Sequence, residues 1–382
     1  MKRLYWRPRK VSRKVLVVIA VMSILSLVAV ESYRVEKKQP HYTKKIRASR
    51  LALKAFEAIK QERQRKRIAI DRNSDPTESG LIGTLLSSTT TNPGHLPAKQ
   101  TSINPNFAGV IVGMLLKTGV EPNDAVAVGL SGSFPAINIA VLTALQSLEV
   151  TPIVITSIGA SQWGANLPTF PWPEFERVLE KNGILQFHSV AMSLGGVQDQ
   201  AQGMSSRGIG KLKDAVLKHG VPLIHTATVA ESIDKRMSIY QEHAGDKEIK
   251  VYINVGGGIA SVGSSVGKRL FRPGLNRYPP PGISEIDSVM ARFAVDGAAV
   301  IHMTKIETLA EKYGLPLVPQ EMPRVGKGKI FRRQVYNIWL VVAALAAIFF
   351  ALWAFVRMDW GYRVFGSGKS SSSSSSRPEP MV

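Results

Sequence analysis

Short apolar segments alternate with amphipathic segments between residues 104 and 319, and this alternation limits the folds open to the chain. Such apolar segments are typical of strands buried on both faces, and the amphipathic segments between them predict helices. Strands joined by helices pair in parallel. We therefore expect an α/β fold, with a mostly parallel sheet and helices on both faces. The predicted strands are 125–128, 152–156, 188–192, 222–225, 250–255 and 298–302, and the predicted helices are 107–118, 135–147, 173–181, 206–219, 229–243, 284–295 and 306–313.

Two apolar runs without charged residues lie outside this region, at residues 15–30 and 338–356. The second has Trp339 and Trp353 near its ends, as in bilayer-spanning segments, because Trp favours the membrane interface. The first reaches spanning length with its flank to residue 33, and it ends in only a weak cleavage site for a signal peptide. We therefore predict N-terminal and C-terminal transmembrane helices rather than a cleaved leader and a buried core helix.

The net charge of +21 is concentrated beside these runs. Residues 1–72 hold 21 Lys and Arg against 5 Asp and Glu, residues 324–382 hold 9 against 2, and the region between is slightly acidic. The middle domain therefore lacks the basic surface on which nucleic-acid binding depends. Clustered basic residues beside a membrane span instead attract anionic lipids or another polyanion, although residues 34–72 could equally be a solvated stalk.

These features predict an organisation in seven parts. Arg13 and Lys14 precede the first apolar run, and Glu31 and Glu36 follow it. Because positive residues favour the cytoplasmic side, this favours a cytoplasmic N-terminus and a large domain outside the cytoplasm. The parts are a basic tail (1–14), a transmembrane anchor (15–33), a basic helical stalk (34–72), the α/β domain (73–323), a basic linker (324–337), a transmembrane helix (338–356) and a Ser-rich low-complexity tail (357–382).

Four of the predicted strands run directly into turns rich in Gly and Ser. In a parallel sheet such turns share the carboxyl edge, where open α/β sheets bind ligands. Glycine lets backbone N–H groups approach an anion and serine adds hydroxyl groups, so we expect a carboxylate or phosphate site, unless these residues only form tight turns. The predicted ligand contacts are Ser131, Gly132, Ser133, Ser157, Ser161, Trp163, Asn166, Ser193, Arg207, Gly256, Gly257 and Gly258; Trp163 could equally close the core, as could Trp172, and Arg207 could be a surface charge.

A serine hydrolase is the enzymatic alternative. Ser131 or Ser133 follows a strand and precedes a helix, as in a nucleophile elbow, but GLSGS at 129–133 lacks the second glycine of that motif. The candidate bases are His188, His225 and His302, with Asp199 as the group that orients the base.

Motifs for a metal or a cofactor are missing from the sequence. It has no Cys and no HExxH, GSSVGKR at 263–269 departs from a P-loop, and GGGIAS at 256–261 departs from a dinucleotide fingerprint. We therefore expect no metal and no cofactor.

Several of these turns resemble one known family in combination. The segments are TSINPNF at 101–107, GLSGSFPA at 129–136, SIGASQWGAN at 157–166, SLGG at 193–196 and NVGGG at 254–258. Together they resemble the bacterial poly-gamma-glutamate system protein family, over about residues 80–267. The resemblance implies a place beside the ligase and membrane subunits that make and export this capsule polymer, in the bacterial plasma membrane, and it implies no reaction.

Three hypotheses follow from the resemblance and the predicted anion site. The first is a membrane-anchored accessory protein that binds glutamyl carboxylates or the polymer at the carboxyl edge of the sheet. The second is a serine hydrolase or transpeptidase acting on the polymer, and the third is a non-binding scaffold of the synthase. The expected partners are the ligase and membrane subunits, the polymer and an anionic membrane, with no nucleic acid.

Overall fold

The structure is a computed structural model that describes residues 13–357. It divides into two compact units. The larger unit is Lys38–Arg332, and the smaller unit joins the chain before Lys38 to the chain after Arg332.

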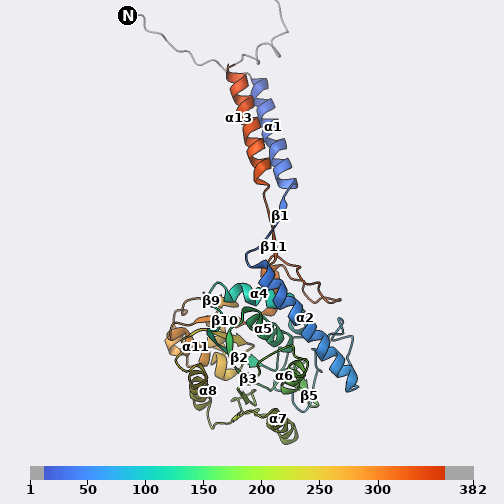
Figure 1. Cartoon of the computed structure of the whole chain (residues 1–382), viewed down its shortest axis with the longest axis vertical. Coiled ribbons are helices and arrows are strands. Elements are labelled where there is room, and N and C mark those ends of the chain that lie inside the picture. The colour runs from blue at the N-terminus through green and yellow to red at the C-terminus, as the bar shows by residue number, and fades with distance from the viewer. Residues whose placement is uncertain (1–12, 358–382) are drawn as a thin grey trace, which may run out of the picture. The chain divides into compact units, whose positions relative to one another are not determined.

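A seven-stranded sheet forms the centre of the larger unit, in the order β7-β6-β3-β2-β8-β10-β9 (Figure 1). Neighbouring strands pair in parallel except β9, which runs antiparallel to β10. The predicted α/β fold with a mostly parallel sheet is therefore confirmed. The strands are β2 (Ala125–Ser131), β3 (Thr151–Ser157), β6 (Ala191–Ser193), β7 (Leu223–Ile224), β8 (Ile249–Val255), β9 (Gly274–Asn276) and β10 (Ala299–Met303), and a separate hairpin pairs β4 (Asn166–Leu167) with β5 (Phe170–Pro171).

The order of the strands reverses at β2. From β2 the chain adds β3, β6 and β7 on one side, and it then adds β8 and β10 on the other side. In such doubly wound sheets the two βα turns on either side of the reversal diverge and leave a crevice at the carboxyl edge. The crevice of this sheet lies where β2 and β8 end.

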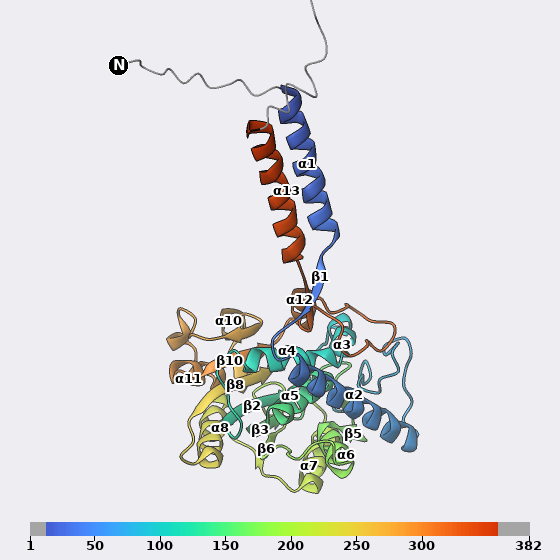
Figure 2. The same cartoon turned by 45° about the horizontal axis from the view of Figure 1, so that its top comes forward.

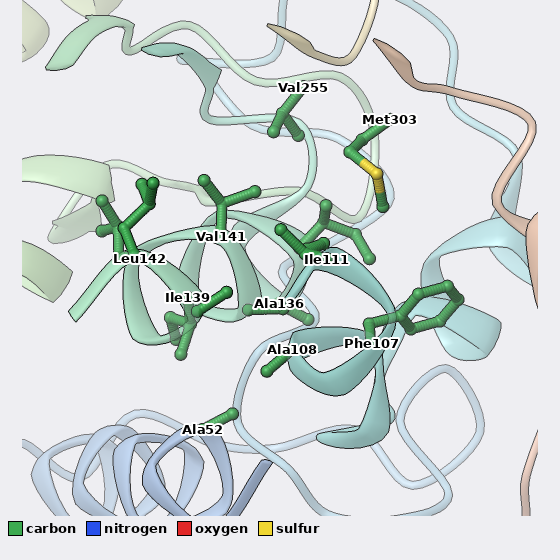
Figure 3. Close-up of a cluster of buried hydrophobic side chains, with 14 of the residues drawn as sticks. Ala52, Phe107, Ala108, Ile111, Ala136, Ile139, Val141, Leu142, Val255 and Met303 are labelled. Carbon is green, nitrogen blue, oxygen red and sulfur yellow. The ribbon is translucent and has the colours of Figure 1, made fainter. Parts of the chain in front are cut away.

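One face of the sheet carries the larger core. Val126, Val128 and Leu130 of β2 project to this face, because side chains alternate along a strand. They pack with residues of α4 and α5, whose apolar side chains interlock with Val255 and Met303 (Figure 3). The helices of this face are α2 (Tyr42–Arg65), α4 (Asn106–Leu115), α5 (Pro135–Leu148), α6 (Trp172–Lys181), α7 (Ser206–His219) and α12 (Ile306–Tyr313), and α3 (Leu96–Ser102) packs on α12.

The opposite face has a second core built on aromatic residues. Ala125 and Ala127 leave space beside β2 for Tyr252 of β8, which stacks on Phe293 with ring centroids 5.0 Å apart. The elements of this face and its connections are α8 (Val229–Ala244), α9 (Ile259–Val262), α10 (Ser265–Leu270), a short 3-10 helix (Ile283–Glu285) and α11 (Val289–Val295) (Figure 2).

Residues 34–72 do not form the separate stalk predicted from their charge. Helix α2 lies against α4 and α5, and its apolar stripe, which includes Ala52, Phe56 and Ile59, is buried in the larger core. These three residues are spaced four and three positions apart, which is the spacing of a helix that buries one face. The domain boundary at residue 73 is therefore corrected, because α2 belongs to the α/β domain.

The smaller unit contains two apolar helices, α1 (Arg13–Ser32) and α13 (Ile338–Arg357), which pack side by side in opposite directions (Figures 1 and 2). Strands β1 (Val35–Lys38) and β11 (Arg332–Val335) pair in a two-stranded sheet. An 18-residue stretch of α13, Ile338–Phe355, is long and apolar enough to cross a membrane, whereas the apolar part of α1, Leu16–Ser32, is shorter than that length. Of the two predicted transmembrane helices, the structure supports the C-terminal one.

Candidate functional site

Three serines end neighbouring parallel strands on one face of the sheet. Ser131 of β2 is in register with Ser157 of β3, and Ser157 is in register with Ser193 of β6. All three side chains are buried and project toward the face covered by α8, because they lie an even number of residues after core residues of that face. The structure thus brings three of the predicted ligand contacts into one row at the carboxyl edge.

A buried ion pair lies against this row. Arg236 of α8 donates from Nη1 to Oδ2 of Asp199 at 2.8 Å and from Nη2 to Oγ of Ser193 at 2.7 Å. Asp199 also accepts from the hydroxyl groups of Ser193 and Ser232, at 2.8 and 2.7 Å. The guanidinium lies within hydrogen-bond distance of Ser157 and Ser193, and each ion of the pair has several hydrogen-bond partners, as burying charge requires.

Arg236 was not among the predicted site residues, although the sequence of α8 contains a signal for it. Ser232, Arg236 and Tyr240 recur every four residues and therefore lie on one side of α8, and all three are buried. Tyr240 marks this side as the one that faces the core. A cation on that side needs a buried partner, and Asp199 is that partner.

The glycine-rich turn after β8 lies directly beside the row. A Cβ added to Gly256 would stand 3.3 Å from Cβ of Ser131, and one added to Gly258 would stand 3.9 Å from Oγ of Ser157. A Cβ added to Gly257 would stand 3.1 Å from Nζ of Lys268. Gly256 has a positive φ of 86°, which favours glycine, and the missing side chain lets the backbone lie close to Ser131.

The N–H groups of this turn are available to a ligand. Gly256 donates to the carbonyl of Met303 at 3.2 Å, but the N–H groups of Gly257 and Gly258 donate to no group within residues 13–357. Both are at least partly exposed. Two free N–H groups beside the ammonium of Lys268 form a concentration of positive potential suited to a carboxylate or a phosphate.

Asn254 and His302 support the turn from below. Nδ2 of Asn254 donates to the carbonyl of Gly256 and to Nδ1 of His302, at 2.9 Å in both cases. Burial, together with the charge of Lys268, lowers the pKa of His302 to about 4, so its ring is neutral at neutral pH. With Nδ1 accepting, the proton of the neutral ring is on Nε2.

A second polar cluster lies at the end of β2 and involves Lys99, which the sequence analysis did not single out. Nζ of Lys99 donates to the carbonyl of Ser133, is 2.8 Å from Oγ of Ser161, and lies 3.8 Å from the centroid of the Phe134 ring. Lys99 is 3% exposed, and within the described part of the chain its ammonium contacts a carbonyl and a hydroxyl group rather than a carboxylate. Burial lowers the pKa of Lys99 to about 7.

The predicted Ser–His–Asp arrangement does not assemble. Ser131 accepts from the N–H of Ser133, and Ser133 accepts from the N–H of Ser161, and between residues 13 and 357 neither hydroxyl contacts a histidine. Asp199 pairs with Arg236. The three candidate histidines lie away from these serines. His188 precedes β6 at the amino edge of the sheet and packs edge-on against His219. His225 is exposed after β7, and His302 accepts a hydrogen bond from Asn254.

Other predicted contacts have structural partners or lie apart. The side chain of Asn166 bonds both backbone groups of Thr84 and the hydroxyl of Thr90, and so fixes the preceding loop. Trp172 is fully buried in the core, whereas Trp163 is partly exposed. Arg207 is exposed near the start of α7. Gly132 packs on the carbonyl of Ile158, where a Cβ would stand 2.5 Å away.

A shallow groove lies between α2 and the end of α5, with a volume of about 430 Å³. Arg47, Arg50 and Lys54 line it from successive turns of α2. Arg47 is 3.3 Å from Glu149, in an exposed ion pair. The basic character predicted for this segment is therefore displayed on the outer side of a core helix.

Comparisons of the chain with models of protein families, with curated proteins and with solved structures found no match.

Proposed function

We propose that the chain is a membrane-anchored accessory protein of poly-gamma-glutamate synthesis or export, and that it binds glutamyl carboxylates in the crevice between β2 and β8. The observation that carries the proposal is the free N–H groups of Gly257 and Gly258 beside Nζ of Lys268. A carboxylate offers two oxygens, one for the N–H groups and one for the ammonium. Such charge-assisted hydrogen bonds are stronger than neutral ones.

The polymer carries one carboxylate per residue, so a single site would hold it weakly. The exposed groove on α2 offers further cations, Arg47, Arg50 and Lys54, to other carboxylates of the same chain. Several weak sites on one polymer raise the overall affinity by effective concentration. The resemblance of the Gly and Ser turns to the poly-gamma-glutamate system family supports this polymer over other polyanions.

In this proposal both α1 and α13 cross the plasma membrane, with the N-terminus in the cytoplasm and the α/β domain outside. Most large apolar residues of both helices are exposed along their length, which water disfavours and lipid favours. Protease added to intact spheroplasts should then digest the domain. A domain that is cut only after lysis contradicts this orientation.

The binding proposal is tested by calorimetric titration of the detergent-solubilised full chain with γ-linked oligoglutamate at two salt concentrations. We expect binding that weakens with salt, and a loss of roughly tenfold in Lys268→Met, the size expected when one charge-assisted hydrogen bond is removed. Lys213→Met, which removes an exposed cation of α7, is the matched control. Absent binding rejects the proposal and favours a non-binding scaffold. Equal binding by Lys268→Met and wild type rejects the site at Lys268.

A further inference from the structure

Lys99 and Ser161 meet in a geometry suited to nucleophilic catalysis. Nζ of Lys99 is 2.8 Å from Oγ of Ser161, the distance at which an amine accepts a hydroxyl proton. A neutral Lys99 can accept this proton with its lone pair while one of its N–H groups bonds the carbonyl of Ser133. The contact to the face of the Phe134 ring keeps water from one side of the amine.

The charges around Lys99 do not hold it in the ammonium form. The turn at 131–134 and the loop at 158–166 contain no charged residue. His95, which immediately precedes α3, has Nδ1 3.4 Å from Oε2 of Glu307 on α12. Burial is the cause of the lowered pKa of Lys99, about 7, so the neutral and the charged forms are both populated at neutral pH.

The loop that carries Ser161 is held firmly against the end of β2. The N–H of Ser161 donates to Oγ of Ser133 at 3.0 Å, and the N–H of Ala165 donates to the carbonyl of Gly132 at 2.7 Å. A Cβ added to Gly164 would stand 2.9 Å from Cα of Ser133, so only glycine permits this approach. Ser161 is partly exposed, and its Oγ lies 2.8 Å from Nζ of Lys99.

We propose that Ser161 and Lys99 form a nucleophile and general-base pair that hydrolyses an acyl bond. Neutral Lys99 takes the proton of Ser161 as Oγ attacks the acyl carbon. The protonated lysine then gives that proton to the leaving amine as the carbon–nitrogen bond breaks. Water, activated by the again neutral Lys99, attacks the acyl-serine, and this step releases the acid and restores the hydroxyl of Ser161.

The substrate class is an amide of a carboxylic acid. Resting on the proposed function, the amide is the γ-glutamyl bond of the polymer whose carboxylates bind at the turn after β8. The turn after β8 would hold the polymer by its carboxylates, and the loop after β3 would cut it; one strand, β2, lies between β3 and β8. The pair differs from the serine hydrolase predicted from sequence, because the nucleophile is Ser161 and the base is a lysine.

The test labels the detergent-solubilised full chain with a fluorophosphonate probe and maps the modified residue by proteolysis and mass spectrometry. We expect labelling of Ser161 at a rate that rises with pH through about 7, where Lys99 loses its proton, and then levels off. Ser161→Ala should abolish it. Lys99→Arg keeps a positive charge but cannot act as a base near neutral pH, and it should slow labelling roughly 10²–10⁴-fold.

Lys45→Met is the control for loss of a buried lysine, since Lys45 is also buried and its ammonium donates to a backbone carbonyl, that of Ile330. Circular dichroism of each variant serves as the check on folding. Unlabelled Ser161 in a folded protein overturns the pair, and so does undiminished labelling of Lys99→Arg. Labelling of Ser161 without release of new amino groups from poly-gamma-glutamate overturns the substrate class, and labelling without polymer binding overturns only the proposed function.

Discussion

Arg236 and Asp199 form an ion pair, with Nη1 2.8 Å from Oδ2, whose two side chains are 3% and 6% exposed beside the serines that end β3 and β6. Asp199 has a positive φ of 61°, so the backbone adopts an uncommon conformation at the residue that supplies this carboxylate. The pair ties the loop after β6 to α8. The positions of Ser157 and Ser193 depend on it, because both hydroxyl groups lie within hydrogen-bond distance of the guanidinium.

We predict that Arg236→Met lowers the free energy of unfolding by about 3–5 kcal/mol, because it leaves the charge of Asp199 buried without a counter-ion. The double variant Arg236→Met/Asp199→Asn should recover a large part of this loss. Urea unfolding followed by circular dichroism measures both. The comparison is Arg47→Ala, which breaks an ion pair whose side chains are 63% and 65% exposed and should change stability by less than about 1 kcal/mol. Equal effects of Arg236→Met and Arg47→Ala would contradict the role of the buried pair.

Gly257→Ala is predicted to separate ligand binding from stability. The new Cβ would stand 3.1 Å from Nζ of Lys268, and this flexible side chain can move away at little cost to folding. Its ammonium would then leave the free N–H groups, and oligoglutamate binding should fall roughly tenfold. The free energy of unfolding should change by less than about 1 kcal/mol.

Gly210→Ala is the matched control for that substitution, because no atom lies within 4 Å of its added Cβ and it lies on α7 away from the turn. It should bind as wild type does. Binding by Gly257→Ala that equals that of Gly210→Ala contradicts the placement of the anion at Lys268.

Much of the sheet could be predicted because most of its strands are short apolar segments, and four of them end in or run into Gly or Ser. Both ends of α7 and of α12 agree with the sequence. The edge strand β9 was missed, since Gly274–Asn276 follows a proline and has no apolar run of its own. It is held by pairing with β10, which is a tertiary contact.

The site was predictable only in part, for a similar reason. Ser131, Ser157 and Ser193 could be placed at one edge, because parallel strands align their carboxyl ends. Lys99 lies on α3, in a segment with no strand or helix pattern in the sequence, and it reaches Ser161 across 62 residues. No local pattern encodes such a pairing.

In α2, charge alone suggested a stalk, although its apolar stripe was present.

Phe56→Ala tests whether α2 belongs to the domain. Phe56 is 1% exposed in the core shared by α2, α4 and α5, so truncation should cost about 3–5 kcal/mol of unfolding free energy, as in other large-to-small core substitutions. Lys54→Ala, on the exposed side of the same helix, should cost less than about 0.5 kcal/mol. Urea unfolding distinguishes the two. A solvated stalk would make both substitutions neutral.

His302 is predicted to make stability depend on pH in the mildly acidic range. In the unfolded chain its pKa is near the ordinary 6.5, whereas in the fold burial and the charge of Lys268 lower the pKa to about 4. Between these values only the unfolded state takes up the proton. Stability contributed by neutral His302 is therefore complete above pH 6.5 and is lost as the pH falls toward 4, by up to about 1.4 kcal/mol per pH unit.

His302→Gln keeps an acceptor for Asn254 but cannot be protonated, so the free energy of unfolding should vary less with pH between 6.5 and 4 than in wild type. His225→Gln, which changes an exposed histidine, should keep the wild-type dependence. Urea unfolding at a series of pH values gives the slopes, and carboxylates contribute equally to all three proteins, so the differences isolate the histidine. A slope in His302→Gln as steep as in His225→Gln would show that His302 takes up its proton in the fold as readily as in the unfolded chain, and would contradict the lowered pKa.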